Sequence, residues 1–152
     1  MAVIENTVDI NRTPDDVFDY LVDLSNELEW NPDVERMERI TDGPIGVGTR
    51  YRAKWRRSSV IVCECTRYDR PHAWTYVNGG PVAVTLDISL SPREGGGTRL
   101  RSRFEAHPKG LFRLVFPMFL RIMRRTEREN MINARAALEG RPATQRPSRA
   151  SS

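Results

Sequence analysis

The sequence predicts an α+β fold in which a long C-terminal helix lies in the concave face of a curved antiparallel sheet. Residues 110–139 form the longest segment with a helical period. One helical face is marked there by spacings of three and four residues, at Met123, Glu127, Met131, Ala134 and Leu138. The segments before it are short, alternate in polarity and are separated by turn residues, as strands are. Because a helix face of this kind has to be buried, the sheet is the surface on which we expect it to pack.

Length and charge favour one folded unit followed by a polar tail. A chain of 152 residues is long enough for one domain with a sizeable core. We expect that domain over residues 1–139 and a disordered tail, rich in Pro, Ser and Arg, over residues 140–152. The tail contains Arg141, Arg146 and Arg149 and no acid, so it accounts for most of the formal charge of +4. Nucleic acid is therefore not an expected partner.

The N-terminus and the cysteines indicate a reducing compartment. The first ten residues lack a basic region followed by an apolar core, so no signal peptide is visible. No apolar run has the length that a bilayer crossing needs. Cys63 and Cys65 fall on one face of the same expected strand, where a disulfide would close almost no loop. We expect two free thiols and a cytoplasmic protein.

The chain begins with one strand and two short helices. Residues 2–10 alternate in polarity, as a strand with one solvated face does. Thr13 is suited to cap a helix that starts at Pro14, and the two acids that follow complement the positive end of the helix dipole. A second cap at Ser25 is expected to begin another short helix. The sequence Trp-Asn-Pro-Asp at 30–33 ends it, since the residue before a proline is disfavoured in a helix.

Six strands separated by turn residues are expected to follow. Their ranges are 34–41, 49–56, 58–68, 72–77, 82–90 and 98–107. Alternation is imperfect in the first of these six strands, which fits a β-bulge. With the strand before the helices, the sheet has seven strands.

Several motifs carry a resemblance to a known superfamily. They are TPDDVFDYLVDLSNELEWNPDVERME, GPIGVGTRYR, YDRPHAWTY, GGGTRLRSRFE and MINARAALE, which span most of residues 2–139. In these motifs and in the order of its elements, the chain resembles the START-like, Bet v 1-like (SRPBCC) superfamily. Within that superfamily, it resembles the polyketide cyclase/dehydrase and lipid-transport group. The resemblance implies a helix-grip fold that encloses a cavity between sheet and long helix. It says little about the ligand, because members of one fold differ in their pockets.

The resemblance also accounts for a stripe of arginines. It places the last strand beside the first, so that Arg99, Arg101 and Arg103 lie on the convex face near Glu5 and Asp9. Cross-strand charge pairing then explains the stripe without a ligand.

Inward-facing aromatic residues are the candidate ligand-binding residues, because cavities of this kind are mostly apolar. Strand alternation points Tyr51, Trp55 and Phe104 inward, and the C-terminal helix supplies Phe116 and Phe119. Trp74 and Tyr76 share one strand face, whose direction the sequence leaves open. The alternative for each is a place in an ordinary core.

No catalytic, metal or cofactor signature is present in the sequence. His72 and His107 are the only histidines, and neither has a nucleophile or acid at the spacing of a triad. Cys63 and Cys65 have no second cluster that would complete a metal site. We therefore expect no metal and no cofactor, and the catalytic residues, if the protein is an enzyme, stay unassigned.

Residues 111–123 are apolar almost all round, which distinguishes them from the rest of the long helix. Pro117 cannot donate to the carbonyl of Arg113, so a kink or break is expected there. Three roles are open for this section. In order of preference, it caps the cavity, packs against a second subunit in a homodimer, or contacts a membrane surface with several arginines near the headgroups, namely Arg121, Arg124, Arg125 and Arg128.

The leading hypothesis is a protein that binds a hydrophobic small molecule, such as a polyketide-like compound, another aromatic compound or a lipid. The first alternative is a polyketide cyclase or dehydratase that acts by shaping its substrate. The second is a membrane-docking or dimeric interaction module. The sequence does not identify the ligand, decide whether catalysis occurs, or give the oligomeric state.

Overall fold

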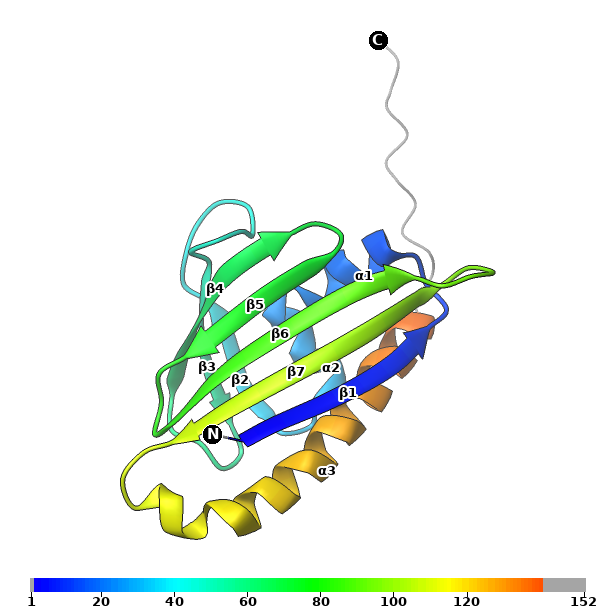
Figure 1. The fold of residues 1–152 in the computed structure, drawn as a ribbon. Coiled ribbons are helices and arrows are strands. Elements are labelled where there is room, and N and C mark those ends of the chain that lie inside the picture. Colours follow the sequence, from blue (N-terminus) through cyan, green and yellow to red (C-terminus); the bar gives the residue numbers. More distant parts are fainter. Residues whose placement is uncertain (1, 141–152) are drawn as a thin grey trace.

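The computed structural model describes residues 2–140 and confirms the predicted α+β helix-grip fold (Figure 1). In chain order the elements are β1 (Ala2–Ile10), α1 (Pro14–Leu21), the 3-10 helix η1 (Leu24–Asn26), α2 (Glu27–Trp30), β2 (Val34–Arg39), β3 (Arg50–Trp55), β4 (Ile61–Asp69), β5 (Ala73–Asn78), β6 (Val82–Pro92), β7 (Thr98–Pro108) and α3 (Phe112–Glu139). Apart from Gly140, the tail predicted at 140–152 lies outside the described residues.

The sheet is antiparallel, with strand order β1-β7-β6-β5-β4-β3-β2. Successive hairpins connect β2 through β7, and β1 completes the sheet by pairing with β7 along its whole length. The predicted bulge in the second strand is confirmed by a register shift between Val34 and Arg36. A further register shift lies in β4 between Cys65 and Arg67. These irregularities bend the strands and increase their local twist, as expected for a curved sheet.

The convex face carries the predicted charge pairs between β1 and β7. Arg99 lies opposite Asp9 in the register, and the Nε of Arg99 is 2.9 Å from the carboxylate of Asp9. The Nε of Arg103 is 3.6 Å from the carboxylate of Glu5. Because these groups are exposed, each pair contributes little to stability. The arginine stripe is thus explained by pairing within the sheet.

The N-terminal cap of α1 is as predicted, and the cap of the second short helix is not. The side chain of Thr13 accepts a hydrogen bond of 3.2 Å from the backbone N–H of Asp16, with Pro14 at the first helical position. The expected cap at Ser25 is wrong: Asp23 is the N-cap of η1, and its carboxylate accepts from the backbone N–H of Ser25 at 3.0 Å. An acid is an equally good acceptor there, and it lies two residues earlier.

Of the kink or break expected at Pro117, the break does not occur, because α3 runs unbroken from Phe112 to Glu139. The helix has already started with tight turns, in which the N–H groups of Phe112 and Arg113 donate to Lys109 and Gly110. Pro117 comes in the second turn, so it removes one hydrogen bond near a helix end, where unpaired backbone groups are common. The helix packs mainly along β1, under the concave side of the sheet (Figure 1).

Candidate functional site

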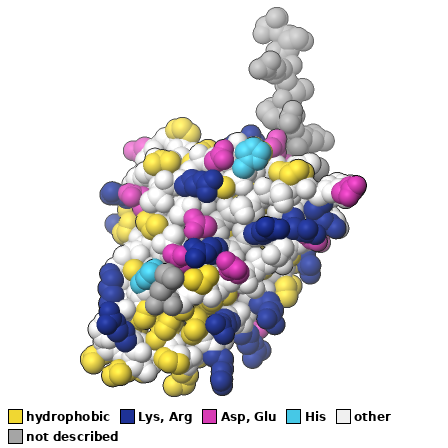
Figure 2. Space-filling model, in the orientation of Figure 1, with side chains coloured by type: hydrophobic (Ala, Val, Ile, Leu, Met, Phe, Trp, Pro, Cys, Tyr) yellow, Lys and Arg dark blue, Asp and Glu magenta, His cyan; other side chains and the backbone are white. Residues whose placement is uncertain are grey.

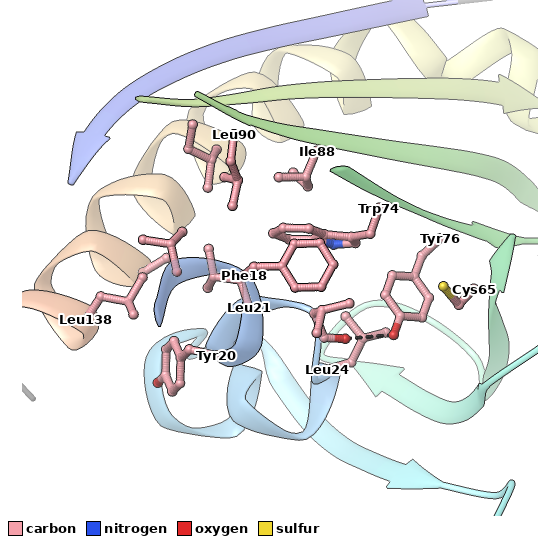
Figure 3. Packing of buried hydrophobic residues seen from close by; sticks show 14 of the residues in the cluster. Phe18, Tyr20, Leu21, Leu24, Cys65, Trp74, Tyr76, Ile88, Leu90 and Leu138 are labelled. Atoms are coloured by element: carbon pink, nitrogen blue, oxygen red, sulfur yellow. Dashed lines mark hydrogen bonds between the residues drawn. The ribbon is translucent and has the colours of Figure 1, made fainter. Parts of the chain in front are cut away.

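One end of the concave face is filled by the chain's own core. There α1 is inserted between the sheet and the second half of α3, and Phe18 packs edge-on against Trp74 with 5.0 Å between ring centroids (Figure 3). Ile88 and Leu90 of β6 are 4% and 7% exposed, and Leu138 of α3 is 1% exposed. This end of the molecule is packed as an ordinary hydrophobic core.

The other end of the concave face is packed less completely. Along β6, the inward residues Val82, Val84 and Leu86 are only partly buried, although they belong to the same strand face as Ile88 and Leu90. The helix side is similar, since Phe116, Leu120 and Met123 contact this cluster and stay partly exposed. Apolar side chains that face each other between sheet and helix therefore remain accessible to solvent.

The structure settles the direction of the strand that carries Trp74 and Tyr76, which face inward. Trp74 lies opposite Ile88 and Tyr76 opposite Leu86 in the register. Trp74 is 2% exposed and belongs to the filled end, beside Phe18. Tyr51 is fully buried, and its ring packs against that of Tyr76 at 6.0 Å between centroids.

Phe104, Phe116 and Phe119 lie at the less completely packed end, whereas Trp55 packs against the main core cluster. Phe104 is 8% exposed and forms a cluster with Ile4 and Ala106 that Phe116 joins. Phe119 lies beside Phe116, at 6.2 Å between ring centroids, outside the two core clusters. Trp55 is partly buried at the end of β3. The seven candidates therefore divide between a packed layer and a partly exposed one.

The two buried tyrosines connect the sheet to the segment between α1 and α2. The hydroxyl of Tyr76 donates to the backbone carbonyl of Val22 at 2.7 Å, a bond drawn in Figure 3. The hydroxyl of Tyr51 donates to the Asp23 carboxylate at 3.1 Å. Burial raises the pKa of both phenols, and the neighbouring Asp23 charge adds to the effect at Tyr51. Both side chains remain neutral hydrogen-bond donors at any physiological pH.

Two glutamates form the polar part of the interior. Glu27 is the first residue of α2, and Glu127 lies on the sheet-facing stripe of α3. Burial, and then the charge of Glu127, raise the pKa of Glu27 to about 7. Burial likewise raises the pKa of Glu127 to about 7. Removing two carboxyls from water while placing them near each other disfavours the ionised form of both.

Neutral donors surround these carboxyls. The Asn31 amide donates to Glu27 Oε2 at 3.4 Å, and the Trp55 indole is a second hydrogen-bond partner of Glu27. Asn130, one helical turn beyond Glu127, hydrogen-bonds to Glu127. The interactions that shift these two pKa values include no cation, so hydrogen bonds alone offset the cost of burial.

Cys63 and Asn78 complete the inner polar row beside Glu27. They lie opposite each other on β4 and β5. Burial, and next the charge of Glu27, raise the pKa of the Cys63 thiol to about 12. This thiol is protonated at neutral pH and is a poor nucleophile. Asn78 Oδ1 is buried and has no hydrogen-bond partner among residues 2–140.

Other candidate chemistry lies elsewhere or is missing from the described residues. His72 and His107 are both exposed, and His107 is 3.9 Å from the Glu105 carboxylate, away from the interior. Within residues 2–140, no group of three or more His, Cys, Asp or Glu side chains could hold a metal ion. Cys63 and Cys65 are free and buried, as predicted.

A surface groove of about 430 Å³ also separates α2 from the second half of α3. It is lined by Leu28, Glu29, Trp30, Asn31, Pro32, Asn133, Ala136 and Ala137. Asn31 lines this groove and also donates to Glu27.

Sequence reasoning missed that Glu27 and Glu127 lie near each other in the interior. A signal for Glu127 was present, because it occupies the apolar stripe that predicted the buried face of α3. An acid at such a position points into the interior unless the helix is rotated. Glu27 gave no comparable signal, since α2 is a single turn whose orientation depends on contacts with distant parts of the chain.

Comparison with known proteins agrees with this geometry. The sequence profile of the polyketide cyclase/dehydrase and lipid transport family matches residues 1–139. No curated protein matches the chain in a sequence search.

Solved structures share the fold at low sequence identity. A Thermus thermophilus protein is 15% identical with a TM-score of 0.75, covering 90% of this chain and 97% of its own. The di-domain aromatase/cyclase StfQ of steffimycin biosynthesis is 14% identical with a TM-score of 0.72, covering 90% of this chain and 50% of its own. Ara h 8.0201 is 17% identical with a TM-score of 0.66, covering 90% of this chain and 97% of its own. Together with the helix-grip architecture, the profile match shows that this chain belongs to the polyketide cyclase/dehydrase and lipid transport family of the START-like superfamily.

Proposed function

We propose that the protein binds a hydrophobic small molecule between α3 and the open end of the concave face. The observation that carries this proposal is the partial exposure of Val84, Leu86 and Leu120, which face an interior bounded by sheet and helix. A ligand that removes about 200 Å² of apolar surface from water there would gain roughly 5 kcal/mol. Family membership supports the same conclusion.

The seven aromatic candidates take two roles in this proposal. Phe104, Phe116 and Phe119 belong to or adjoin the partly exposed cluster and would contact the ligand, and so would Trp55, which is partly buried near Glu27. Tyr51, Trp74 and Tyr76 would form the base of the site and hold it in shape.

The polar groups restrict which hydrophobic molecules fit. A ligand that lies beside Glu27, Glu127 and Asn78 Oδ1 meets acceptor atoms, of which Asn78 Oδ1 has no hydrogen-bond partner among residues 2–140. A hydroxyl or similar hydrogen-bond donor on the ligand would satisfy them, whereas an anionic group would be repelled by any ionised carboxylate. We therefore infer a largely apolar ligand with a donor group, such as a phenolic polyketide or a lipid alcohol.

A probe titration with two matched variants tests the binding proposal. Val84→Phe adds volume to the inner face of β6, and Val62→Phe adds the same side chain on β4, where Val62 is 45% exposed. Binding of the neutral fluorescent probe N-phenyl-1-naphthylamine should weaken about tenfold or more in Val84→Phe, because its ring occupies the ligand volume. The control Val62→Phe should bind as the wild type does. Equal probe affinity in both variants, with both shown to be folded, would rule out this location.

The glutamate pair favours a second candidate function, proton transfer to and from a bound substrate. Two neighbouring carboxyls with pKa values near 7 allow one to be ionised while the other is protonated. On a hydrophobic β-hydroxyketone, the carboxylate would take a proton from the carbon next to the carbonyl. The carboxylic acid would protonate the departing hydroxyl, so that a C=C bond forms and water leaves. This is a dehydration, one of the reactions in the family description.

Turnover of such a substrate separates an enzyme from a binding protein. Glu27→Gln and Glu127→Gln should each lower kcat by a factor of about 100 or more, because neither amide can exchange a proton. Glu129→Gln is the control, since Glu129 is exposed on the same helix and pairs with Arg125. Absence of turnover in the wild type, or equal rates in all three variants, would leave binding alone.

A further inference from the structure

The first half of α3 has a second apolar face that points away from the sheet. Leu111, Leu114 and Met118 are 83%, 79% and 69% exposed. Phe112, Val115 and Ile122 are also exposed. We call these six residues the α3 outer face. Spacings of three, four and seven place most of them on one side of the helix, opposite Phe116, Leu120 and Met123, which face the sheet.

The two faces of this part of α3 correspond to different roles among those that the sequence left open for residues 111–123. Phe116, Leu120 and Met123 cover the interior, and the α3 outer face contacts nothing in residues 2–140 that buries it. A contiguous exposed apolar surface on one helix is uncommon in a monomer that only binds a small ligand. It is typical of a surface that docks on something larger.

Most charged side chains around the α3 outer face are basic, although Arg125 is paired with Glu129. Between Ala106 and Thr126 the sequence contains five basic residues and no acid, the basic ones being Lys109, Arg113, Arg121, Arg124 and Arg125. The β3–β4 turn at this end carries Arg57 and Val60, which is 51% exposed, together with Arg56, whose Nε lies 3.9 Å from the Asp33 carboxylate. Figure 2 shows apolar side chains gathered at this lower end, with basic side chains on either side of them.

Several contacts hold these segments together at one end of the molecule. The N–H of Lys109 donates to the carbonyl of Pro81 at 3.2 Å, which joins the β7–α3 connection to the β5–β6 turn. Gly80 of that turn lies against the side chain of Ile61, at the start of β4. These segments therefore lie at the same end of the protein.

The charge pattern decides between two occupants. A second copy docked face to face would bring two predominantly basic helix segments together, which opposes a symmetric dimer. An anionic bilayer satisfies both features, because apolar side chains enter the boundary between headgroups and acyl chains while arginines and lysines contact phosphates. Within residues 2–140, no helix is long and apolar enough to span a bilayer. We propose that the α3 outer face docks the protein on the surface of an anionic lipid membrane.

Docking in this orientation would bring the open end of the concave face to the membrane. Phe116, on the inner side of the same helical turns, packs against the same cluster as Val84. A hydrophobic ligand could then pass between bilayer and interior over a short path. The docking proposal stands without this step, because it rests on the outer face and its charges.

Vesicle flotation with matched charge-introducing variants tests the proposal. Leu114→Glu places an acid in the α3 outer face, and Ile132→Glu places the same acid on an exposed site of the same helix, where Ile132 is 47% exposed. The vesicles are phosphatidylcholine with phosphatidylglycerol, and phosphatidylcholine alone. The wild type should float with the anionic vesicles and at least about tenfold less with the neutral ones, and added salt should weaken binding.

The two variants give the decisive comparison. Leu114→Glu should lower binding to anionic vesicles by about tenfold or more, and Ile132→Glu by less than about twofold. Equal melting temperatures would show that both variants are folded, since both sites are exposed. A wild type that binds neither kind of vesicle, or equal loss in both variants, would overturn the proposal. So would a stable dimer that Leu114→Glu separates, because the α3 outer face would then bind a second copy. Probe binding in solution is measured without membranes, so failure here is distinguishable from failure of the ligand-binding proposal.

Discussion

Replacing Glu27 by Gln is expected to stabilise the protein above neutral pH and to leave its stability almost unchanged near pH 4. Glutamine keeps the shape and the acceptor for the Asn31 amide and removes the charge that burial disfavours. At about pH 8 the gain in the free energy of unfolding should be on the order of 2 kcal/mol, given a pKa raised by burial and partial access to solvent. Glu127→Gln should behave in the same way.

The sign of this effect follows from proton binding. The folded-state pKa is about 7 for both residues, whereas the ordinary value is 4.5, so the folded protein holds more protons between these limits. The free energy of unfolding therefore falls as pH rises from about 4.5 to about 7 and is constant above that range with respect to these groups. Ionisation of Asp9 affects the free energy of unfolding at lower pH than ionisation of the two glutamates does, because the hydrogen bond from Arg99 lowers the pKa of Asp9.

Urea unfolding at several pH values measures the effect. The double variant of Glu27 and Glu127 should lose most of the decline in stability between about pH 5 and 7.5, and the Glu129→Gln control should retain it. If the wild type has the same stability at both ends of this range, the two carboxyls are not buried as described.

Replacing Trp74 by Ala is expected to cost about 3–5 kcal/mol in the free energy of unfolding. Trp74 is 2% exposed and packs against Phe18, which is fully buried, so a large cavity would remain between β5 and α1. Leu114→Ala is the matched control, because Leu114 is 79% exposed, and it should change stability by less than about 0.5 kcal/mol.

Thermal or urea unfolding separates a core role for Trp74 from a purely ligand-contacting one. A loss of about 2–4 °C in Tm per kcal/mol is expected for a domain of this size, so Trp74→Ala should melt well below the wild type. A change no larger than that of Leu114→Ala would mean that Trp74 borders open space rather than the core.

The sequence was sufficient to predict the strands and their order along the chain, because each strand has its own pattern of alternating polarity. Alternation in β7, with Leu100 and Ser102 inward and Arg99 and Arg101 outward, identifies both the strand and its buried face. A register of this kind is strongly specified, since a shift of one residue would bury the arginines. The stripe that ends at Ala134 and Leu138 likewise identified the buried face of α3.

Predictions that depended on one local rule were less successful. A proline usually ends a helix, but one lost hydrogen bond in the second turn is a small cost compared with packing Phe116 and Leu120 against the sheet. Ser25 is a good cap residue, but Asp23 caps the short helix from two residues earlier. In both cases the surrounding packing and neighbouring residues decided the outcome.

The candidate site was predictable only in part, because it combines residues from elements far apart in the sequence. Alternation identified Tyr51, Trp55 and Phe104 as inward-facing, and their burial differs because α1 fills only one end of the concave face. The proximity of Glu27 to Glu127 depends on how α2 packs against α3. No sequence pattern in a single element carries that information.

Native mass spectrometry of gently purified protein tests the central claim, which is that the interior holds a hydrophobic molecule. We predict a species heavier than the chain alone, whose excess mass is lost on denaturation and can be extracted into organic solvent. The excess should be absent from Val84→Phe and present in Val62→Phe. A wild-type protein that shows only the mass of the chain, and that takes up no apolar compound when supplied with one, would contradict the claim.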